Sequence, residues 1–191
     1  MDQIIKEAFI ESADIKKKFA QNNAAKIEKI TEEIVEAFKR GNKLLLFGNG
    51  GSAADCQHIA AEFVNRFKIE RPPLPAIALT TDTSIITSIG NDYDFSEIFV
   101  KQIKAIAAAG DIVIAISTSG NSPNIVKAIE TCKKLELTTI LLSGSNGGKA
   151  LELSDYAFLV PTEDTPRIQE VHIILAHVLC EMVDFKLFKG A

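Results

Sequence analysis

Two short loops in this chain combine glycine with serine or threonine in a way that suits the binding of phosphate. Residues 48–52 (GNGGS) directly follow the apolar run 43–47, and residues 117–122 (STSGNS) directly follow the apolar run 111–116. Each loop therefore reads as the turn from a buried parallel strand into a helix, where unpaired backbone N–H groups and the helix dipole favour an anion. Together the two loops predict a site for a phosphorylated small molecule.

The first loop matches neither of the common nucleotide-binding fingerprints. It lacks the Gly-Lys-Ser/Thr of a Walker loop, and Gly48, Gly50 and Gly51 are followed by Ala54 instead of the spacing of the dinucleotide motif. Adjacent glycines let the backbone approach a ligand closely, and Ser52 could cap the helix or contact a phosphate oxygen. The alternative is a tight strand-to-helix turn with Ser52 as an ordinary helix cap.

The second loop offers hydroxyl groups in place of basic side chains. Its hydroxyl residues are Ser117, Thr118, Ser119 and Ser122. Pro123 suits the first position of a helix, which makes Ser122 the residue that caps it. The alternative is a serine-rich turn that satisfies its own backbone, but two such loops at equivalent strand ends favour ligand binding.

A histidine and a carboxylate on the helix after the first loop form a candidate metal site. His58 and Glu62 are four residues apart, so they share one helical face, and imidazole and carboxylate are suitable zinc ligands at this spacing. Gln169 and His177, eight residues apart on the apolar C-terminal helix, also share a face. The alternatives are a surface His–Glu pair and a core histidine, each more common than a metal ligand when it stands alone.

These candidate residues require a scaffold in which strands and helices alternate. Strands are predicted at 43–47, 75–79, 111–116, 138–142 and 156–160, and helices at 52–67, 82–90, 94–108, 123–134, 147–153 and 166–187. The first, third and fourth strands are continuous apolar runs, as expected when helices cover both faces of a sheet. The alternation predicts one α/β domain with a five-stranded parallel sheet, in which ligands bind beyond the carboxyl ends of the strands.

Residues 1–40 precede this alternating pattern and read as a pair of amphipathic helices. Gly41-Asn42 is a suitable signal for the end of the second helix. A helical pair this apolar must bury its face, either against its own sheet or against a second subunit.

The composition is typical of a soluble globular protein. Hydrophobic residues make up 47% and charged residues 24% of the chain, and the net charge of −4 argues against nucleic acid or an anionic membrane as the main partner. No run reaches the roughly 18 apolar residues that a membrane span needs. The N-terminus lacks the apolar core of a signal peptide, and the three cysteines form no disulfide framework. A cytoplasmic location with reduced thiols is therefore predicted.

Five motifs along the chain resemble those of the bacterial phosphoheptose isomerases, which belong to the sugar isomerase (SIS) domain family. They are GNGGSAAD at 48–55, HIAAE at 58–62, GND at 90–92, STSGNS at 117–122 and RIQEVH at 167–172. The resemblance covers essentially the whole chain. The STSGNS loop alone marks only the broad SIS superfamily, whereas HxxxE combined with RIQExH and the histidine that follows it is far more specific.

This resemblance implies a flavodoxin-like sheet, a homotetramer with active sites between subunits, and one zinc ion per subunit. It also implies conversion of sedoheptulose 7-phosphate to D-glycero-D-manno-heptose 7-phosphate through an enediol, the first step toward nucleotide-activated heptose for surface polysaccharide. The implied zinc ligands are His58, Glu62, Gln169 and His177, with Glu62 and His177 as the acid/base pair. The implied substrate-binding residues are Asn49, Gly50, Gly51, Ser52, Arg66, Asn91, Asp92, Ser117, Thr118, Ser119, Ser122 and Gln169.

Two other functions are compatible with the same scaffold. One is an isomerase for another sugar phosphate, such as a hexose or pentose phosphate, because its phosphate loops would be the same. The other is a non-enzymatic module that senses a sugar phosphate or binds a replication initiator. Such non-enzymatic relatives would be expected to lack the complete set of His58, Glu62, Gln169 and His177, which this chain contains.

Overall fold

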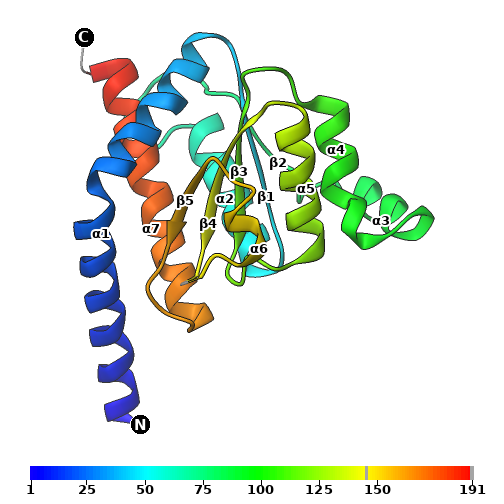
Figure 1. Cartoon of the computed structure of the whole chain (residues 1–191). Coiled ribbons are helices and arrows are strands. Elements are labelled where there is room, and N and C mark those ends of the chain that lie inside the picture. Colours follow the sequence, from blue (N-terminus) through cyan, green and yellow to red (C-terminus); the bar gives the residue numbers. More distant parts are fainter. Residues whose placement is uncertain (145, 190–191) are drawn as a thin grey trace.

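A five-stranded parallel sheet forms the centre of the computed structural model, which describes residues 1–144 and 146–189 (Figure 1). Its strands are β1 (Leu44–Gly48), β2 (Ala76–Ala78), β3 (Ile112–Ser117), β4 (Thr138–Ser143) and β5 (Tyr156–Leu159). The strand order is β2-β1-β3-β4-β5, and every pairing is parallel. The predicted flavodoxin-like sheet is therefore confirmed, with its topological switch point between β1 and β3.

Helices lie on both sides of this sheet, as the alternating sequence pattern predicted (Figure 1). One side carries α1 (Asp2–Lys39), α2 (Gly51–Val64) and α7 (Thr165–Asp184). The other side carries α3 (Thr83–Asp92), α4 (Ile98–Ile106), α5 (Pro123–Lys134) and α6 (Gly148–Leu151). A 3₁₀ turn, η1 (Phe95–Glu97), leads into α4, and a π-helical turn, η2 (Phe185–Lys189), follows α7.

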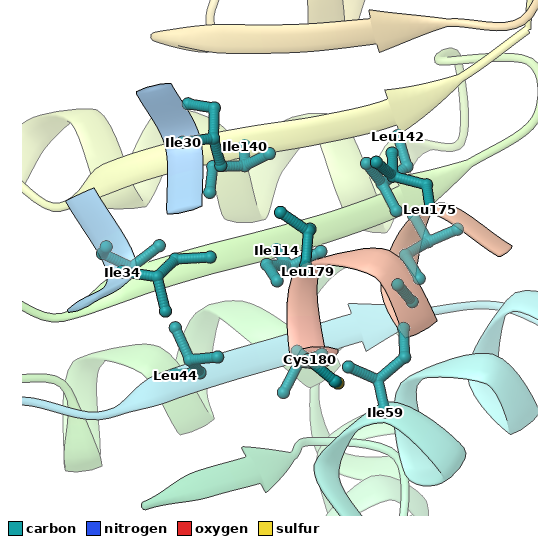
Figure 2. Packing of buried hydrophobic residues seen from close by; sticks show 14 of the residues in the cluster. Ile30, Ile34, Leu44, Ile59, Ile114, Ile140, Leu142, Leu175, Leu179 and Cys180 are labelled. Atoms are coloured by element: carbon teal, nitrogen blue, oxygen red, sulfur yellow. The ribbon is translucent and has the colours of Figure 1, made fainter. Parts of the chain in front are cut away.

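The side chains of β1 show why the central strands are apolar throughout. Leu44 and Leu46 belong to the core beneath α1, α2 and α7, whereas Leu45 and Phe47 belong to the core beneath α4 and α5. Successive side chains of a strand point to opposite faces, so a strand covered on both sides needs an unbroken apolar run. Figure 2 shows the first core, where Ile30, Ile34, Ile59, Leu175 and Leu179 from the three helices pack on Leu44, Ile114, Ile140 and Leu142 of the sheet. This core fixes α2 and α7, which carry the candidate metal ligands, to the sheet.

The pair of helices predicted for residues 1–40 is wrong, because the structure has one continuous helix, α1. The polar segment 21–23 contains neither glycine nor proline, and Asn23 Nδ2 donates a hydrogen bond to the carbonyl oxygen of Phe19 one turn earlier. The segment therefore stays within the helix, since only glycine or proline would strongly disfavour it there. Near the start of α1, the exposed apolar side chains are Ile4, Ile5, Phe9 and Ile10.

The other predicted elements differ from the observed ones only at their ends. The long C-terminal helix stops at Asp184 and continues as η2, and the helix predicted at 94–108 is divided into η1 and α4. Within the described ranges, no helix is long and apolar enough to cross a membrane.

Candidate metal and phosphate site

The helices α2 and α7 lie side by side, and their contacts follow the same order along both helices. Near the start of both helices, a Cβ atom added to Gly51 would lie 2.5 Å from Nε2 of Gln169. Two turns further along, His58 Nε2 and His177 Nε2 are 3.4 Å apart. The two segments that carry the candidate ligands are far apart in the sequence, and the fold brings them together.

His58, Glu62 and His177 form a cluster with the donor set of a zinc site. His58 Nε2 is 3.1 Å from Glu62 Oε1, and one ligand atom from each of the three residues lies within 4.8 Å of the others. Two imidazole nitrogens 3.4 Å apart require a proton or a cation between them, because their lone pairs repel. Tetrahedral zinc with Zn–N bonds of about 2.05 Å would separate two nitrogens by about 3.3 Å. The cluster therefore fits a zinc ion in both chemistry and spacing.

Neighbouring side chains fix the orientation of this cluster and set its electrostatics. The ring of Phe67, in the segment after α2, stacks on His177 with centroids 5.5 Å apart and planes inclined by 24°. One turn before His58, Asp55 is half-buried, and its Oδ2 has no hydrogen-bond partner among the described residues. Burial raises the pKa of Asp55, while the nearby imidazole of His58 opposes that rise. A partly desolvated carboxylate beside the imidazole of His58 makes the surroundings more favourable for a cation.

Gln169, the fourth predicted ligand, lies on α7 with its amide at the first loop, and its part in the metal site stays a prediction. It precedes His177 by eight residues on α7, and its amide nitrogen lies against Gly51 at the first loop. This position suits a role in substrate binding at that loop.

At the first loop, no side chain of the described residues caps the N-terminus of α2. Gly50 is the N-cap residue with φ of 53°, a conformation that favours glycine. Ser52 is buried in the first turn, so it does not cap the helix as the simpler interpretation required. Asn49 and the buried Asn124 of α5 exchange two amide hydrogen bonds of 2.8 and 2.9 Å. This amide pair ties the first loop to the helix that follows the second loop.

The second loop borders a cavity of about 220 Å³ beyond the carboxyl ends of β3 and β4. The cavity is lined by Thr118, Ser119, Asn121, Gly144, Asn146, Thr162, Glu163, Thr165 and Ile168. Gly120 is required for the loop to close, because its φ is +62° and an added Cβ atom would lie 1.8 Å from the carbonyl oxygen of Gly147. The cavity has the lining of hydroxyl and amide groups that a phosphate monoester needs.

The four hydroxyls of the second loop are used in different ways. Ser117 is buried and its Oγ accepts the N–H of Gly120, while Ser119 Oγ accepts the N–H of Asn121. Ser122 is the N-cap residue of α5, with Pro123 in its first turn as predicted, yet its hydroxyl caps no backbone N–H in the described part of the chain. The hydroxyls of Thr118 and Ser122 therefore remain available for a ligand, whereas Ser117 serves the loop itself.

Besides Gln169, three predicted substrate-binding residues lie outside these loops. Asn91 and Asp92 are exposed at the end of α3, on the opposite side of the sheet from α2 and α7, and Asn91 Nδ2 donates to Asp92 Oδ1 over 2.8 Å (Figure 1). Arg66 is exposed just beyond α2, where its Nε is 3.6 Å from Glu70 Oε2. A single chain therefore does not bring Asn91 and Asp92 to the metal cluster.

Sequence reasoning missed several residues that contribute to the site. Asn124, which pairs with Asn49, lies in the first turn of the helix after the second loop, and this position was the only sequence signal for it. Thr162, in the segment between β5 and α7, and Thr165, the first residue of α7, also line the cavity, and no motif in the sequence points to either.

Beneath the second loop, a buried histidine connects α7 to the strand ends. His172 is fully buried, its Nε2 lies 3.3 Å from the carbonyl oxygen of Ser143, and burial lowers its pKa to about 4. Ser143 in turn donates from Oγ to the carbonyl oxygen of Ser117 over 2.7 Å. Neutral His172 therefore acts as a hydrogen-bond donor that supports the second loop.

Comparisons with known proteins agree with this architecture. The SIS domain family model matches residues 9–144. The phosphoheptose isomerase of Thermodesulfovibrio yellowstonii is 56% identical over 185 residues, which are 97% of this chain and 92% of that protein.

Two solved structures of phosphoheptose isomerases are similar over almost their full length. The enzyme of Neisseria gonorrhoeae, GmhA, has a TM-score of 0.90 and 39% identity, with 96% of this chain and 98% of that chain covered. The enzyme of Francisella tularensis has a TM-score of 0.92 and 38% identity, with coverage of 95% and 97%. The chain therefore belongs to the SIS domain family and, within it, to the phosphoheptose isomerases.

Proposed function

We propose that this protein converts sedoheptulose 7-phosphate to D-glycero-D-manno-heptose 7-phosphate through an enediol, as the first step of nucleotide-activated heptose synthesis. Its place among the phosphoheptose isomerases gives the general reaction, the isomerisation of a sugar phosphate. The observation that carries the finer proposal is the cluster of His58, Glu62 and His177, two members of which lie on the helix that begins at the first loop.

One zinc ion per subunit would be held by His58, Glu62 and His177, with Gln169 as the proposed fourth ligand. Two imidazoles and a carboxylate make up a known ligand set of catalytic zinc sites. When bound, zinc supplies a Lewis acid that polarises the carbonyl and hydroxyl oxygens of the sugar.

The two loops would hold the phosphate and so position the rest of the sugar chain. The proposed phosphate-binding residues are Ser52, Ser117, Thr118, Ser119 and Ser122, and the proposed residues near the sugar are Asn49, Gly50, Gly51, Arg66, Asn91, Asp92 and Gln169. Anchoring a remote group in this way spends binding energy on orienting the reacting carbons. The hydroxyls of Thr118 and Ser119 are the best placed, because both residues line the cavity, whereas Ser117 is buried.

Glu62 and His177 would carry out the proton transfers. Isomerisation requires a base that moves a proton between C1 and C2, which we assign to Glu62, and a group that exchanges protons with the sugar oxygens, which we assign to His177. Metal ligation lowers the basicity of a carboxylate, so Glu62 cannot be a tight ligand and a strong base in the same step. We expect Glu62→Gln to abolish turnover and to leave a folded protein by circular dichroism, and near-normal turnover would refute this assignment.

The metal content of the purified protein and an isomerase assay test the proposal together. We expect bound zinc, turnover of sedoheptulose 7-phosphate, loss of that turnover with a chelator, and its recovery when zinc is restored. Hexose and pentose phosphates serve as comparison substrates, and faster turnover of one of them would replace the heptose assignment. Protein that binds a sugar phosphate but contains no metal and has no turnover would instead support the sensor or initiator-binding function.

We further propose a single-domain subunit that assembles into a cytoplasmic homotetramer with no nucleic-acid partner. Exposed Asn91 and Asp92 lie on the other side of the sheet from the metal cluster, so a site between subunits would explain how they reach substrate. The exposed apolar side chains at the start of α1 offer a surface for assembly. All three cysteines are free and buried, as a reducing compartment allows. The molar mass in solution tests the tetramer.

A further inference from the structure

We propose that Arg71 is a positioning residue for the metal cluster, because it fixes the last turn of α2, which carries Glu62, to α7, which carries His177. Arg71 lies in the segment between α2 and β2, outside both phosphate loops. The inference rests on the proposed metal site and assigns to that site a residue that contacts neither metal nor substrate.

The guanidinium of Arg71 binds the carbonyl oxygens at the end of α2. Its Nη2 donates to the carbonyl oxygen of Glu62 over 2.8 Å, and its Nη1 donates to those of Phe63 over 2.6 Å and Asn65 over 3.1 Å. The last carbonyls of a helix have no intrahelical partner, and a cation at this end also stabilises the helix dipole. Arg71 therefore determines the backbone position from which the Glu62 side chain extends.

The same guanidinium is bonded to α7. Its Nε donates to Oδ1 of Asp184 over 2.9 Å, and the Arg71 and Asp184 side chains are only 1% and 5% exposed. Asp184 follows His177 by seven residues, which is close to two helical turns, so the two side chains lie on the same face of α7. One buried ion pair thus connects the helix segment of one proposed ligand to the helix of another.

A metal site is sensitive to small displacements of its ligands. Metal–ligand distances are held within about 0.2 Å of their ideal values, so a shift of the last turn of α2 against α7 weakens binding even when every ligand is present. Arg71 can limit such a shift because its planar fork fixes several hydrogen bonds at once.

A second ion pair in the same region provides a matched control. Lys68 Nζ is 2.7 Å from Glu181 Oε2, so this pair also joins the segment after α2 to α7. Its side chains are 58% and 53% exposed, and Lys68 Nζ makes no hydrogen bond to a carbonyl oxygen of α2 in the described part of the chain. If a link between the two segments were sufficient, the two pairs would have similar effects on metal binding.

The test measures the dissociation constant of zinc for the full-length metal-stripped protein, by competition with a chromophoric chelator. Arg71→Lys keeps the charge but removes the fork, and Asp184→Asn keeps the size but removes the charge. We expect each variant to weaken zinc binding by roughly 10- to 100-fold, as for other residues that orient metal ligands. We expect Glu181→Gln to change it by no more than about twofold. The urea midpoint of each metal-free variant is measured in parallel, since a purely structural role lowers the midpoint without changing zinc affinity in folded protein.

The outcomes separate this inference from the proposed function. Zinc affinity within about threefold of the unmodified protein in both folded variants overturns the inference and leaves the metal site standing. If Arg71→Lys does not fold, Asp184→Asn decides by the same criterion, and failure of both to fold assigns the pair to stability alone and also overturns the inference. If the unmodified protein itself binds no zinc, the proposed metal site fails, and the inference fails with it.

Discussion

The burial of His172 predicts that the protein loses stability in mildly acidic solution. This imidazole is fully buried, its Nε2 lies 3.3 Å from the carbonyl oxygen of Ser143, and burial lowers its pKa from 6.5 to about 4. In the unfolded chain the same group titrates near its ordinary value. Between these two pKa values the unfolded state binds more protons, so stability rises with pH. The contribution is complete above pH 6.5, declines as the pH falls toward 4, and is lost below it.

The size of this effect follows from the two pKa values. Lowering the pH from 7.5 to 4.5 should reduce the free energy of unfolding by about 2.5 kcal/mol through His172 alone. Other groups also titrate in this range, so the relevant quantity is the difference between the unmodified protein and His172→Gln. Glutamine retains an N–H donor for Ser143 but does not titrate.

Urea unfolding at four or five pH values measures this difference. The experiment uses metal-free protein with a chelator present, because protonation of zinc ligands would add its own pH dependence. We expect the unmodified protein to lose about 2.5 kcal/mol relative to His172→Gln as the pH falls. A difference that stays constant within about 0.5 kcal/mol would refute the reasoning that His172 is buried in its neutral form.

Two further substitutions test the phosphate loops. Gly120→Ala places a Cβ atom 1.8 Å from the carbonyl oxygen of Gly147, so we expect the second loop to be displaced, with a rise in KM for sugar phosphate of roughly 100-fold or more and a lower melting temperature. An unchanged KM would show that this loop does not hold the phosphate. Asn124→Ala breaks the two amide hydrogen bonds to Asn49, so we expect KM to rise roughly tenfold with little change in metal content. An altered metal content with an unchanged KM would contradict the proposed link between the loops.

The strands that consist of buried apolar residues could be predicted from the sequence. Residues 44–47 and 112–116 are apolar at every position, and such short runs followed by turn residues are expected for strands covered on both faces. The division of residues 1–40 into two helices is wrong because the local sequence does not decide between one helix and two. A polar segment without glycine or proline, such as 21–23, is consistent with either a break or a continuous helix, and tertiary packing decides between them.

The candidate site could be predicted only as far as local spacing reaches. His58 and Glu62 are recognisable because four residues place them on one helical face. His177, on a distant helix, joins them in prediction only through the resemblance to the phosphoheptose isomerases, and the fold brings the three together. The pair of Arg71 and Asp184 could not be found in this way. Each is an unremarkable charged residue in its own segment, and their importance arises from burial and mutual contact, which depend on tertiary structure.

The parallel course of α2 and α7 has a mechanical consequence. Gln169 and His177 of α7 lie beside Gly51 and His58 of α2, and Asp184 is linked to the end of α2 through Arg71. A shift of one helix along the axis of the other would therefore disturb all of these contacts at once. The end of the pair at the proposed phosphate loop and the end at the proposed metal cluster are therefore coupled, and an axial shift that alters one also alters the other.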